Sequence, residues 1–244
     1  MRAFILCNKD SEPYNPNIFN AYYGLRDMGF ECIFFRTHQD LIDHHHLRGE
    51  IIVGGIGIIR DRLGDFGIDI PVVDYPDELG GYLGRIIYKS TLSEITKPEK
   101  WPVFIKSQEQ KRISGRVVRG AKDLMGIGNQ EEDIKLYCSS VLDIVSEYRV
   151  FVRYGQILDC KHYWGDSMIF PDGSLIKQAI SDYHSAPDSY GIDFGVLRDR
   201  RTIMIEVNDA FALGCYGLEA HLYAKFLLTR WAQLTGTVDE FFYI

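Results

Sequence analysis

Two neighbouring apolar segments near the C-terminal end of the chain carry polar residues at a spacing that suits cation binding. The first segment contains Asp193, and the second contains Glu206 and Asn208. Side chains two residues apart on a strand point to the same face, so Glu206 and Asn208 are expected side by side. If the two segments pair as a hairpin through residues 198–201, Asp193 joins them.

The predicted cluster combines two carboxylates with one amide oxygen. Two carboxylates about 4 Å apart repel each other by roughly 4 kcal/mol at an effective dielectric constant near 20. A divalent cation would relieve this repulsion, and an all-oxygen donor set suits Mg²⁺ or Mn²⁺. Mg²⁺ held by one or two carboxylates usually also binds nucleotide phosphates, so the cluster predicts a metal–nucleotide site.

Basic residues precede this cluster in the chain. Lys106 ends a strand-like segment, and Lys111 follows in a stretch that could fold as a loop over phosphates, with Gly115 just beyond it. Glu147 and Arg149 are expected on one face of a later strand. Two lysines and an arginine beside a metal cluster would suit nucleoside triphosphate chemistry, because the cations offset phosphate charge while Mg²⁺ bridges phosphate oxygens.

Bulk composition is that of an ordinary globular protein. The chain has 244 residues, 46% of them hydrophobic and 25% charged, with a net charge of −7, which argues against broad nucleic-acid or membrane-surface binding. The five cysteines are scattered and form no CxxC pair, so a zinc site or disulfide frame is not expected and a reduced, cytoplasmic setting fits. The N-terminus reads as a strand and not as a signal peptide, and no apolar run approaches a membrane span.

The first 80 residues alternate between strand-like and helical stretches, which is typical of a small parallel α/β unit. Strands are expected at residues 2–7, 31–36, 51–53 and 71–73, and helices at 15–28 and 41–46. Asn15 is the expected cap of the first helix, before Pro16, and Gly29 its stop. A linking helical region is expected over residues 77–96.

The rest of the chain reads as an α+β arrangement with mostly antiparallel sheets. Strands are expected at residues 101–106, 114–119, 148–154, 156–163, 174–176, 192–197 and 202–207, and a helix at 217–234. Residues 133–137 and 143–146 are ambiguous between the two states.

Three other local patterns are weaker. Asp193-Phe194-Gly195 matches a protein-kinase metal motif, but no His-Arg-Asp loop precedes it, and the same tripeptide recurs at residues 65–67, so we reject that interpretation. The glycines of residues 54–57 lack a dinucleotide or Walker spacing and favour a tight turn. Three consecutive histidines at residues 44–46 cannot easily chelate together and favour a solvated surface.

Five motifs occur in order along the chain: Phe-Ile-Lys, Lys-x-x-Ser-Gly, Glu-Tyr-Arg-Val-Phe-Val, Ile-Asp-Phe-Gly-Val and Ile-Glu-Val-Asn-Asp. Taken together they resemble the ATP-grasp superfamily, and most of all a compact branch related to carboxylate–amine (amide and peptide) ligases. The similarity spans about residues 85–235. It implies a Rossmann-like domain over residues 1–84, followed by an ATP-grasp fold over 85–244 with central and C-terminal subdomains.

The resemblance implies a role for each matching residue. Lys106 matches a strand lysine that contacts ATP phosphates, and Lys111 is a partner in the phosphate-covering loop. Arg149 matches the arginine that approaches the γ-phosphate and the acyl-phosphate, with Glu147 counted among the cofactor-binding residues. The remaining assignments are the metal ligands Asp193, Glu206 and Asn208, the adenine hinge residues Cys138, Ser139 and Val141, and the substrate-side candidates Tyr163 and Lys177.

The implied reaction uses ATP and Mg²⁺ or Mn²⁺. ATP phosphorylates a carboxylate, an amine attacks the acyl-phosphate, and ADP is released. The expected partners are small-molecule or peptide carboxylates and amines, without nucleic acid or membrane, and a homodimer stays an open alternative. Two other functions remain open: an ATP-dependent phosphoryl transferase on the same fold, and a nucleotide-binding module without chemistry.

Overall fold

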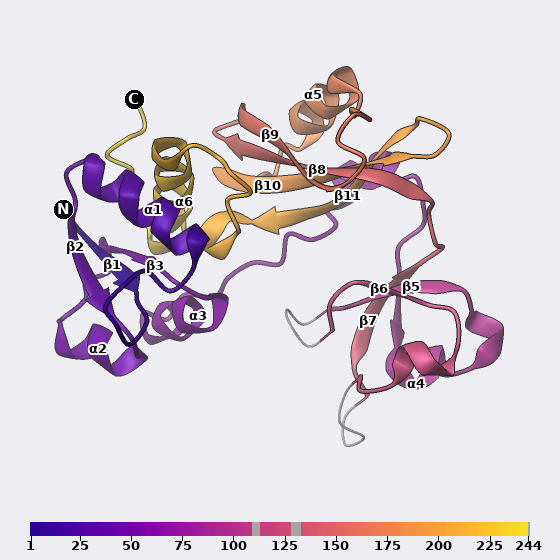
Figure 1. Ribbon diagram of the computed structural model, residues 1–244, viewed down its shortest axis with the longest axis horizontal. Helices are drawn as coiled ribbons and strands as arrows, with labels where there is room; N and C mark the ends of the chain where they lie inside the picture. Colours follow the sequence, from indigo (N-terminus) through magenta and orange to yellow (C-terminus); the bar gives the residue numbers. More distant parts are fainter. Residues whose placement is uncertain (109–112, 128–132, 244) are drawn as a thin grey trace. The chain divides into compact units, whose positions relative to one another are not determined.

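The computed structural model describes residues 1–108, 113–127 and 133–243 (Figure 1). Their packing divides the chain into two compact units, Met1–Tyr82 with Val145–Ile244, and Leu83–Ile144. These units follow packing alone; the division into domains 1–84 and 85–244 stays a prediction. The predicted combination of an α/β N-terminal part with a mostly antiparallel α+β remainder is confirmed.

A three-stranded parallel sheet forms the N-terminal part of the first unit. Its strands are β1 (Arg2–Leu6), β2 (Glu31–Phe35) and β3 (Ile51–Val53), in the order β2-β1-β3. All three were expected, but the fourth strand predicted at residues 71–73 is wrong. Val72 in that stretch is 67% exposed, so its apolar side chain has no sheet or core to join.

The helices of this part follow their capping residues. In α1 (Pro16–Asp27), the Asn15 side chain accepts hydrogen bonds from two backbone amides, as predicted, and Gly29 takes a left-handed conformation after the helix. A capping box between Thr37 and Asp40 starts α2 (His38–Asp43) three residues earlier than expected.

The helix α3 (Ile56–Asp65) was not anticipated. It begins directly after Gly55, so the tight turn predicted over residues 54–57 is wrong. The surface position predicted for the histidine run is wrong for His46, which is 2% exposed. Its Nε2 lies 2.7 Å from the carbonyl oxygen of Glu50, and its Nδ1 accepts a hydrogen bond from Arg62.

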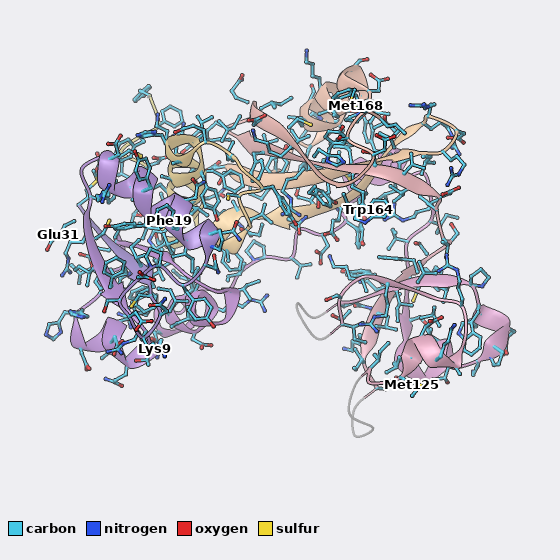
Figure 2. All side chains as sticks on the ribbon, viewed as in Figure 1. Lys9, Phe19, Glu31, Met125, Trp164 and Met168 are labelled. Atoms are coloured by element: carbon cyan, nitrogen blue, oxygen red, sulfur yellow. The ribbon has the colours of Figure 1, made fainter. Side chains whose placement is uncertain are left out.

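The larger sheet of the first unit has the strand order β11-β10-β8-β9. Its strands are β8 (Ile144–Arg153), β9 (Gln156–Gly165), β10 (Ser189–Leu197) and β11 (Thr202–Asp209). The strand predicted at residues 174–176 is wrong, because Asp172 caps α5 (Gly173–Asp182) there by accepting two backbone hydrogen bonds. In the loop between β9 and α5, Met168 projects outward, as does Trp164 at the end of β9 (Figure 2).

The C-terminal helix α6 (Ala220–Thr235) packs against both sheets of this unit. It lies along α1 (Figure 1), and one buried cluster includes residues from the small sheet, α1, β8 and α6. Phe151 of β8 packs edge-on against Phe226 at 5.3 Å, and the Trp231 indole donates to the Arg48 carbonyl at 3.0 Å. The larger sheet is therefore held against the N-terminal part by a continuous apolar core.

The second unit contains a four-stranded antiparallel sheet in the order β4-β7-β5-β6. Its strands and helix are β4 (Tyr88–Thr91), α4 (Leu92–Ile95), β5 (Val103–Ser107), β6 (Arg116–Val118) and β7 (Lys135–Ser139). The helical region expected over 77–96 is wrong at β4. Short 3₁₀ turns complete the chain at Asp77–Tyr82, Pro98–Lys100, Ala121–Leu124 and Ala210–Ala212.

All five cysteines are free thiols. Within the described part of the chain, no helix has the length and apolar character needed to cross a membrane.

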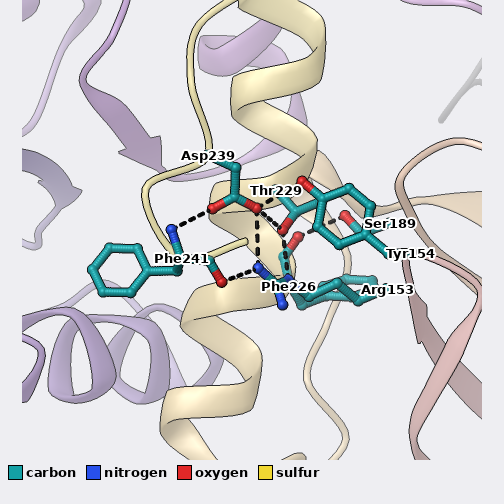
Figure 3. Close-up of polar contacts among 7 residues, drawn as sticks. All are labelled: Arg153, Tyr154, Ser189, Phe226, Thr229, Asp239 and Phe241. Carbon is teal, nitrogen blue, oxygen red and sulfur yellow. Dashed lines mark hydrogen bonds and ion pairs between the residues drawn. The ribbon is translucent and has the colours of Figure 1, made fainter. Parts of the chain in front are cut away.

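A polar network fastens the segment after α6 to β8 (Figure 3). Asp239 accepts hydrogen bonds from Arg153, Tyr154 and Thr229. Arg153 also donates to the Phe241 carbonyl at 2.6 Å. Burial acts to raise the pKa of Asp239, but hydrogen bonds led by that from Thr229 outweigh it and lower the pKa, so the carboxylate stays ionised and paired.

Replacing Asp239 by Ala should therefore destabilise the protein. The Arg153 and Asp239 side chains are only 9% and 5% exposed, so the substitution leaves a buried guanidinium without its carboxylate. We expect a loss of about 3–5 kcal/mol in the free energy of unfolding, measured by chemical denaturation. Glu240→Ala, at the exposed neighbouring position, is the control and should change stability by less than about 0.5 kcal/mol. Equal stability of the two variants would contradict a fastening role.

His221 should make the contact between α1 and α6 depend on pH. Its ring nitrogens lie 2.8 Å from Glu219 and 2.6 Å from Asp27, and hydrogen bonding to these carboxylates raises its pKa above 6.5. The stabilising contribution is thus fully present below pH 6.5 and is lost as the pH rises through the raised value. His221→Gln should remove this component from a series of denaturation curves between about pH 5 and 9. The exposed His184→Gln is the control; an identical pH profile for both variants would refute the prediction.

Candidate active site on one face of the large sheet

The predicted hairpin brings the three proposed metal ligands together. β10 and β11 pair antiparallel, with Asp193 opposite Glu206 and Gly191 opposite Asn208. The register shifts just after Asp193, where a β-bulge lies between Asp193 and Phe194. Bulges re-aim side chains at functional sites, and this one lies at the position where the carboxylate must be directed.

Arg149 of β8 forms a bidentate ion pair with Asp193. The Arg149 Nε–Asp193 Oδ1 and Nη2–Oδ2 distances are both 2.7 Å, and the two residues are 6% and 2% exposed. The Tyr163 hydroxyl and the Asn208 amide also donate to Asp193 Oδ2, at 3.4 and 3.3 Å. Side chains from β8, β9 and β11 thus converge on one carboxylate of β10.

Gly191 leaves room for this ion pair. A Cβ atom at this position would lie 2.4 Å from the Leu213 side chain and 3.4 Å from Arg149 Cδ. Since Gly191 lies two residues before Asp193 on the same strand, any larger residue would press on the segment after β11 and on the arginine stem. The glycine is therefore required by close packing.

Two further carboxyl groups, those of Glu147 and Glu206, act on the region of this pair. Burial raises the pKa of Asp193 to about 6, against the hydrogen bonds and charge of Arg149. Burial also raises the pKa of Glu147; a hydrogen bond from Tyr163 opposes this, and the charge of Glu206 adds to it. At neutral pH the Asp193 carboxylate is ionised. Glu147 and Glu206 thus act electrostatically on the region of the ion pair, and a group of neighbouring carboxylates suits a cation.

The donor chemistry of Asp193, Glu206 and Asn208 fits Mg²⁺ or Mn²⁺, which prefer oxygen ligands. Among the residues that the structure describes, no group of three or more His, Cys, Asp or Glu side chains is arranged to hold a metal. The predicted set contains only two such side chains, because its third member is an amide. Asn208 directs its Nδ2 to Asp193, and only its Oδ1 could serve a cation. The metal assignment stays a prediction.

Asp209, the last acidic residue of β11, has a different partner. It pairs with Arg230 of α6 through both carboxylate oxygens, and the Arg230 Nε–Asp209 Oδ1 distance is 2.8 Å. The two residues are 8% and 3% exposed. The alternation of a strand explains this separation, since Asn208 and Asp209 point to opposite faces. Asp209 anchors the end of β11 to the helix.

Two tyrosines beside Arg149 complete the cluster. Tyr163 was a substrate-side candidate, and Tyr216 was missed, because no pattern in the sequence marks it. Their rings stack 5.0 Å apart with 14° between planes, and the Arg149 guanidinium carbon lies 5.8 Å from the Tyr163 ring and 4.7 Å from the Tyr216 ring. Burial, with the charge of Asp193, raises the pKa of Tyr163, so it remains a neutral hydrogen-bond donor.

Two lysines near this sheet differ in position. Lys161 of β9 was not predicted; it lies directly opposite Arg149 in the strand register and pairs with Asp159 at 2.7 Å. Lys177, a substrate-side candidate, is exposed on α5, and no described interaction connects it with the arginine pair.

The remaining predicted residues belong to the second unit. Lys106 lies on β5 opposite Tyr137, while Lys111 lies outside the described residues. Cys138 is 1% exposed and is paired on both sides within the sheet; burial raises the pKa of its thiol to about 11. Ser139 is also buried, and Val141 follows the strand. The adenine and phosphate roles of these residues stay predictions.

Comparison with known proteins identifies a family. Residues 82–226 match the model described as "ATP-grasp domain, R2K clade family 2". No curated protein matches the chain.

Solved structures share the fold at low sequence identity. D-cycloserine synthetase is 9% identical, with 95% of this chain and 100% of that chain covered and a TM-score of 0.60. An L-amino acid ligase from Bacillus licheniformis is 10% identical, with 100% and 77% covered and a TM-score of 0.58. A D-alanine–D-alanine ligase from Bacillus anthracis is 13% identical, with 98% and 99% covered and a TM-score of 0.56.

The Arg149–Asp193 pair should be the main electrostatic support of the sheet. Arg149→Met leaves Asp193 buried without its cation, and we expect the free energy of unfolding to fall by about 3–5 kcal/mol in chemical denaturation. Lys161→Met at the opposite register position is the matched control. Its ion pair with Asp159 is about one-third exposed, with side-chain exposures of 29% and 36%, and should cost less than about 1 kcal/mol. Similar losses in both variants would argue against a special role for the buried pair.

Proposed function

The chain belongs to the ATP-grasp domain family of the R2K clade, family 2, and we propose that it is an ATP-dependent ligase. It would join a carboxylate to an amine through an acyl-phosphate and release ADP. The observation that carries this proposal is the Arg149–Asp193 pair, flanked by Glu206 and Asn208 on one hairpin. Phosphoryl transfer uses an arginine to offset phosphate charge and oxygen donors to hold a metal ion, and both kinds of group are present here.

The proposed reaction has two steps. A carboxylate oxygen of the first substrate attacks the γ-phosphorus of ATP, and the bond to the β–γ bridging oxygen breaks, which yields an acyl-phosphate and ADP. The nitrogen of an amine then attacks the acyl carbon, the phosphate leaves, and the nitrogen loses a proton. No covalent enzyme intermediate is needed, so positioning and charge neutralisation supply the catalysis.

In this scheme Arg149 offsets charge on the transferred phosphoryl group. Its guanidinium uses Nε and Nη2 for Asp193, which fixes its orientation, while Nη1 is not part of that pair. Asp193, Glu206 and Asn208 would hold Mg²⁺, which when bound supplies further charge neutralisation at the phosphates. Tyr163 keeps the Asp193 carboxylate oriented through its hydroxyl. The phosphate role of Lys106, the cytoplasmic location and a homodimer remain predictions from sequence.

The reaction class can be tested by incubating the protein with Mg²⁺, ATP and pools of carboxylates and amines. Release of ADP together with an amide product mass supports the proposal. Release of AMP would rule out an acyl-phosphate route. A stable phosphorylated product that forms without an amine would instead indicate a phosphoryl transferase.

Glu206→Gln tests the proposed metal end of the site. The substitution keeps the size of the side chain and removes its charge, so we expect Mg²⁺-dependent ATP turnover with an identified acceptor to fall by roughly 100-fold or more. Asp199→Asn is the matched control, because Asp199 lies at the turn of the same hairpin with its side chain 54% exposed, and it should retain activity. Full ATP turnover in the Glu206 variant would show that the site is wrongly assigned.

A further inference from the structure

Tyr216 has a backbone conformation that its residue type does not favour. Residues 215–218 form a tight turn in which the Leu218 amide donates to the Cys215 carbonyl at 2.8 Å. The two central residues, Tyr216 and Gly217, have φ values of +44° and +79°. Such turns strongly prefer Asn or Gly at both positions. A bulky side chain in the left-handed region is strained, and its presence needs a compensating reason.

The surrounding structure holds this turn rigidly. The Cys215 amide donates to Asn17 Oδ1 at 3.0 Å, and Asn20 Nδ2 donates to the Leu218 carbonyl at 2.9 Å. The hydroxyl of the buried Tyr223 donates to the Leu213 carbonyl at 2.6 Å. The first turns of α1 and α6 thus fix the segment from both sides. Core burial does not explain the choice of tyrosine, because Tyr216 is 46% exposed.

The Tyr216 side chain contributes instead to the candidate active site. Its ring stacks on Tyr163, and both rings lie within 6 Å of the Arg149 guanidinium carbon. We call this stacked pair the tyrosine platform. Strained residues persist where the structure over-determines them, and they concentrate at ligand clamps. The platform therefore presents a partly exposed aromatic ring directly beside the arginine that would handle the phosphoryl group.

The electrostatic surroundings indicate which substrate would meet the platform. Glu147 interacts with the Tyr163 hydroxyl and places a carboxylate beside the platform and the paired Arg149 and Asp193, which suits a protonated amine better than a second carboxylate. An exposed aromatic ring favours a flat π-system in stacked or edge-to-face contact. Both features describe the same molecule, an amine with an aromatic side chain.

We propose that the tyrosine platform is the specificity element for the amine substrate and selects amines with an aromatic group. This inference rests on the proposed ligase function. Tyr216 is a binding residue in this scheme, and Tyr163 both supports its ring and orients Asp193. Stacking of one aromatic pair should give a preference of about two- to tenfold over an aliphatic side chain.

The test compares phenylalanine with leucine as probes, since they share the amino and carboxylate groups and differ in the ring. Calorimetric titration of the full chain in the presence of Mg²⁺ and a non-hydrolysable ATP analogue gives both affinities. We expect wild type and Tyr216→Phe to bind phenylalanine about two- to tenfold more tightly than leucine. Tyr216→Asn, which suits the turn but lacks the ring, should lose this preference.

Thermal melting of the same variants separates binding from structure. Because Asn is favoured at a left-handed position, Tyr216→Asn should melt at or above the wild-type temperature. A clearly lower melting temperature would mean that the tyrosine serves stability, and the inference would fall. It would also fall if wild type bound neither probe, or if the preference for phenylalanine survived in Tyr216→Asn.

Failure of the proposed function has a different signature. A protein that binds phenylalanine through Tyr216 but forms no ADP with any carboxylate and amine would keep the platform and lose the ligase assignment. A protein that forms amides of phenylalanine no faster than those of leucine, in wild type and in Tyr216→Asn alike, would keep the ligase assignment and lose the platform.

Discussion

The buried ion pair between Arg149 and Asp193 is the constraint around which the larger sheet is organised. Neither charge could be buried alone at acceptable cost, and each satisfies the other through two short hydrogen bonds. The pair also fixes strand register. A slip of one residue would turn Asp193 to the opposite face and leave both charges without a partner. The arrangement of Arg149 and Asp193 that would serve the proposed reaction is therefore also the arrangement that stabilises the sheet.

Consecutive residues of β11 alternate between two roles: some belong to the candidate site, and others anchor the strand. Glu206 and Asn208 belong to the polar face with Asp193, whereas Val207 is fully buried and Asp209 pairs with Arg230 of α6. Because side chains alternate along a strand, each position that anchors β11 fixes the direction of its neighbour. The helix also carries Phe226 and Trp231 into the N-terminal core. The positions of Glu206 and Asn208 on the polar face therefore depend on how Val207 and Asp209 pack on the opposite face.

Local sequence patterns predict much of this architecture, and the incorrect predictions have physical causes. The hairpin that joins Asp193 to Glu206 follows from alternating apolar residues around a polar turn. Residues 174–176 of α5 are wrongly predicted as a strand because the apolar pair Leu175 and Ile176 outweighs the cap at Asp172. The partnership of Arg149 with Asp193 spans 44 positions in the chain, and the ring stacking of Tyr216 depends on a turn held by α1. Such long-range contacts leave no local periodicity.

Charge balance links the fold to the proposed reaction. The Nε and Nη2 atoms of Arg149 are committed to Asp193, and Glu147 and Glu206 place further negative charge nearby. A triphosphate without a cation would add to this negative charge, and Coulomb repulsion opposes its entry. A nucleotide that arrives with a divalent cation brings a counter-charge for the carboxylates and phosphate oxygens for the guanidinium. In the proposed reaction, these residues would therefore favour the metal–nucleotide complex over the nucleotide alone.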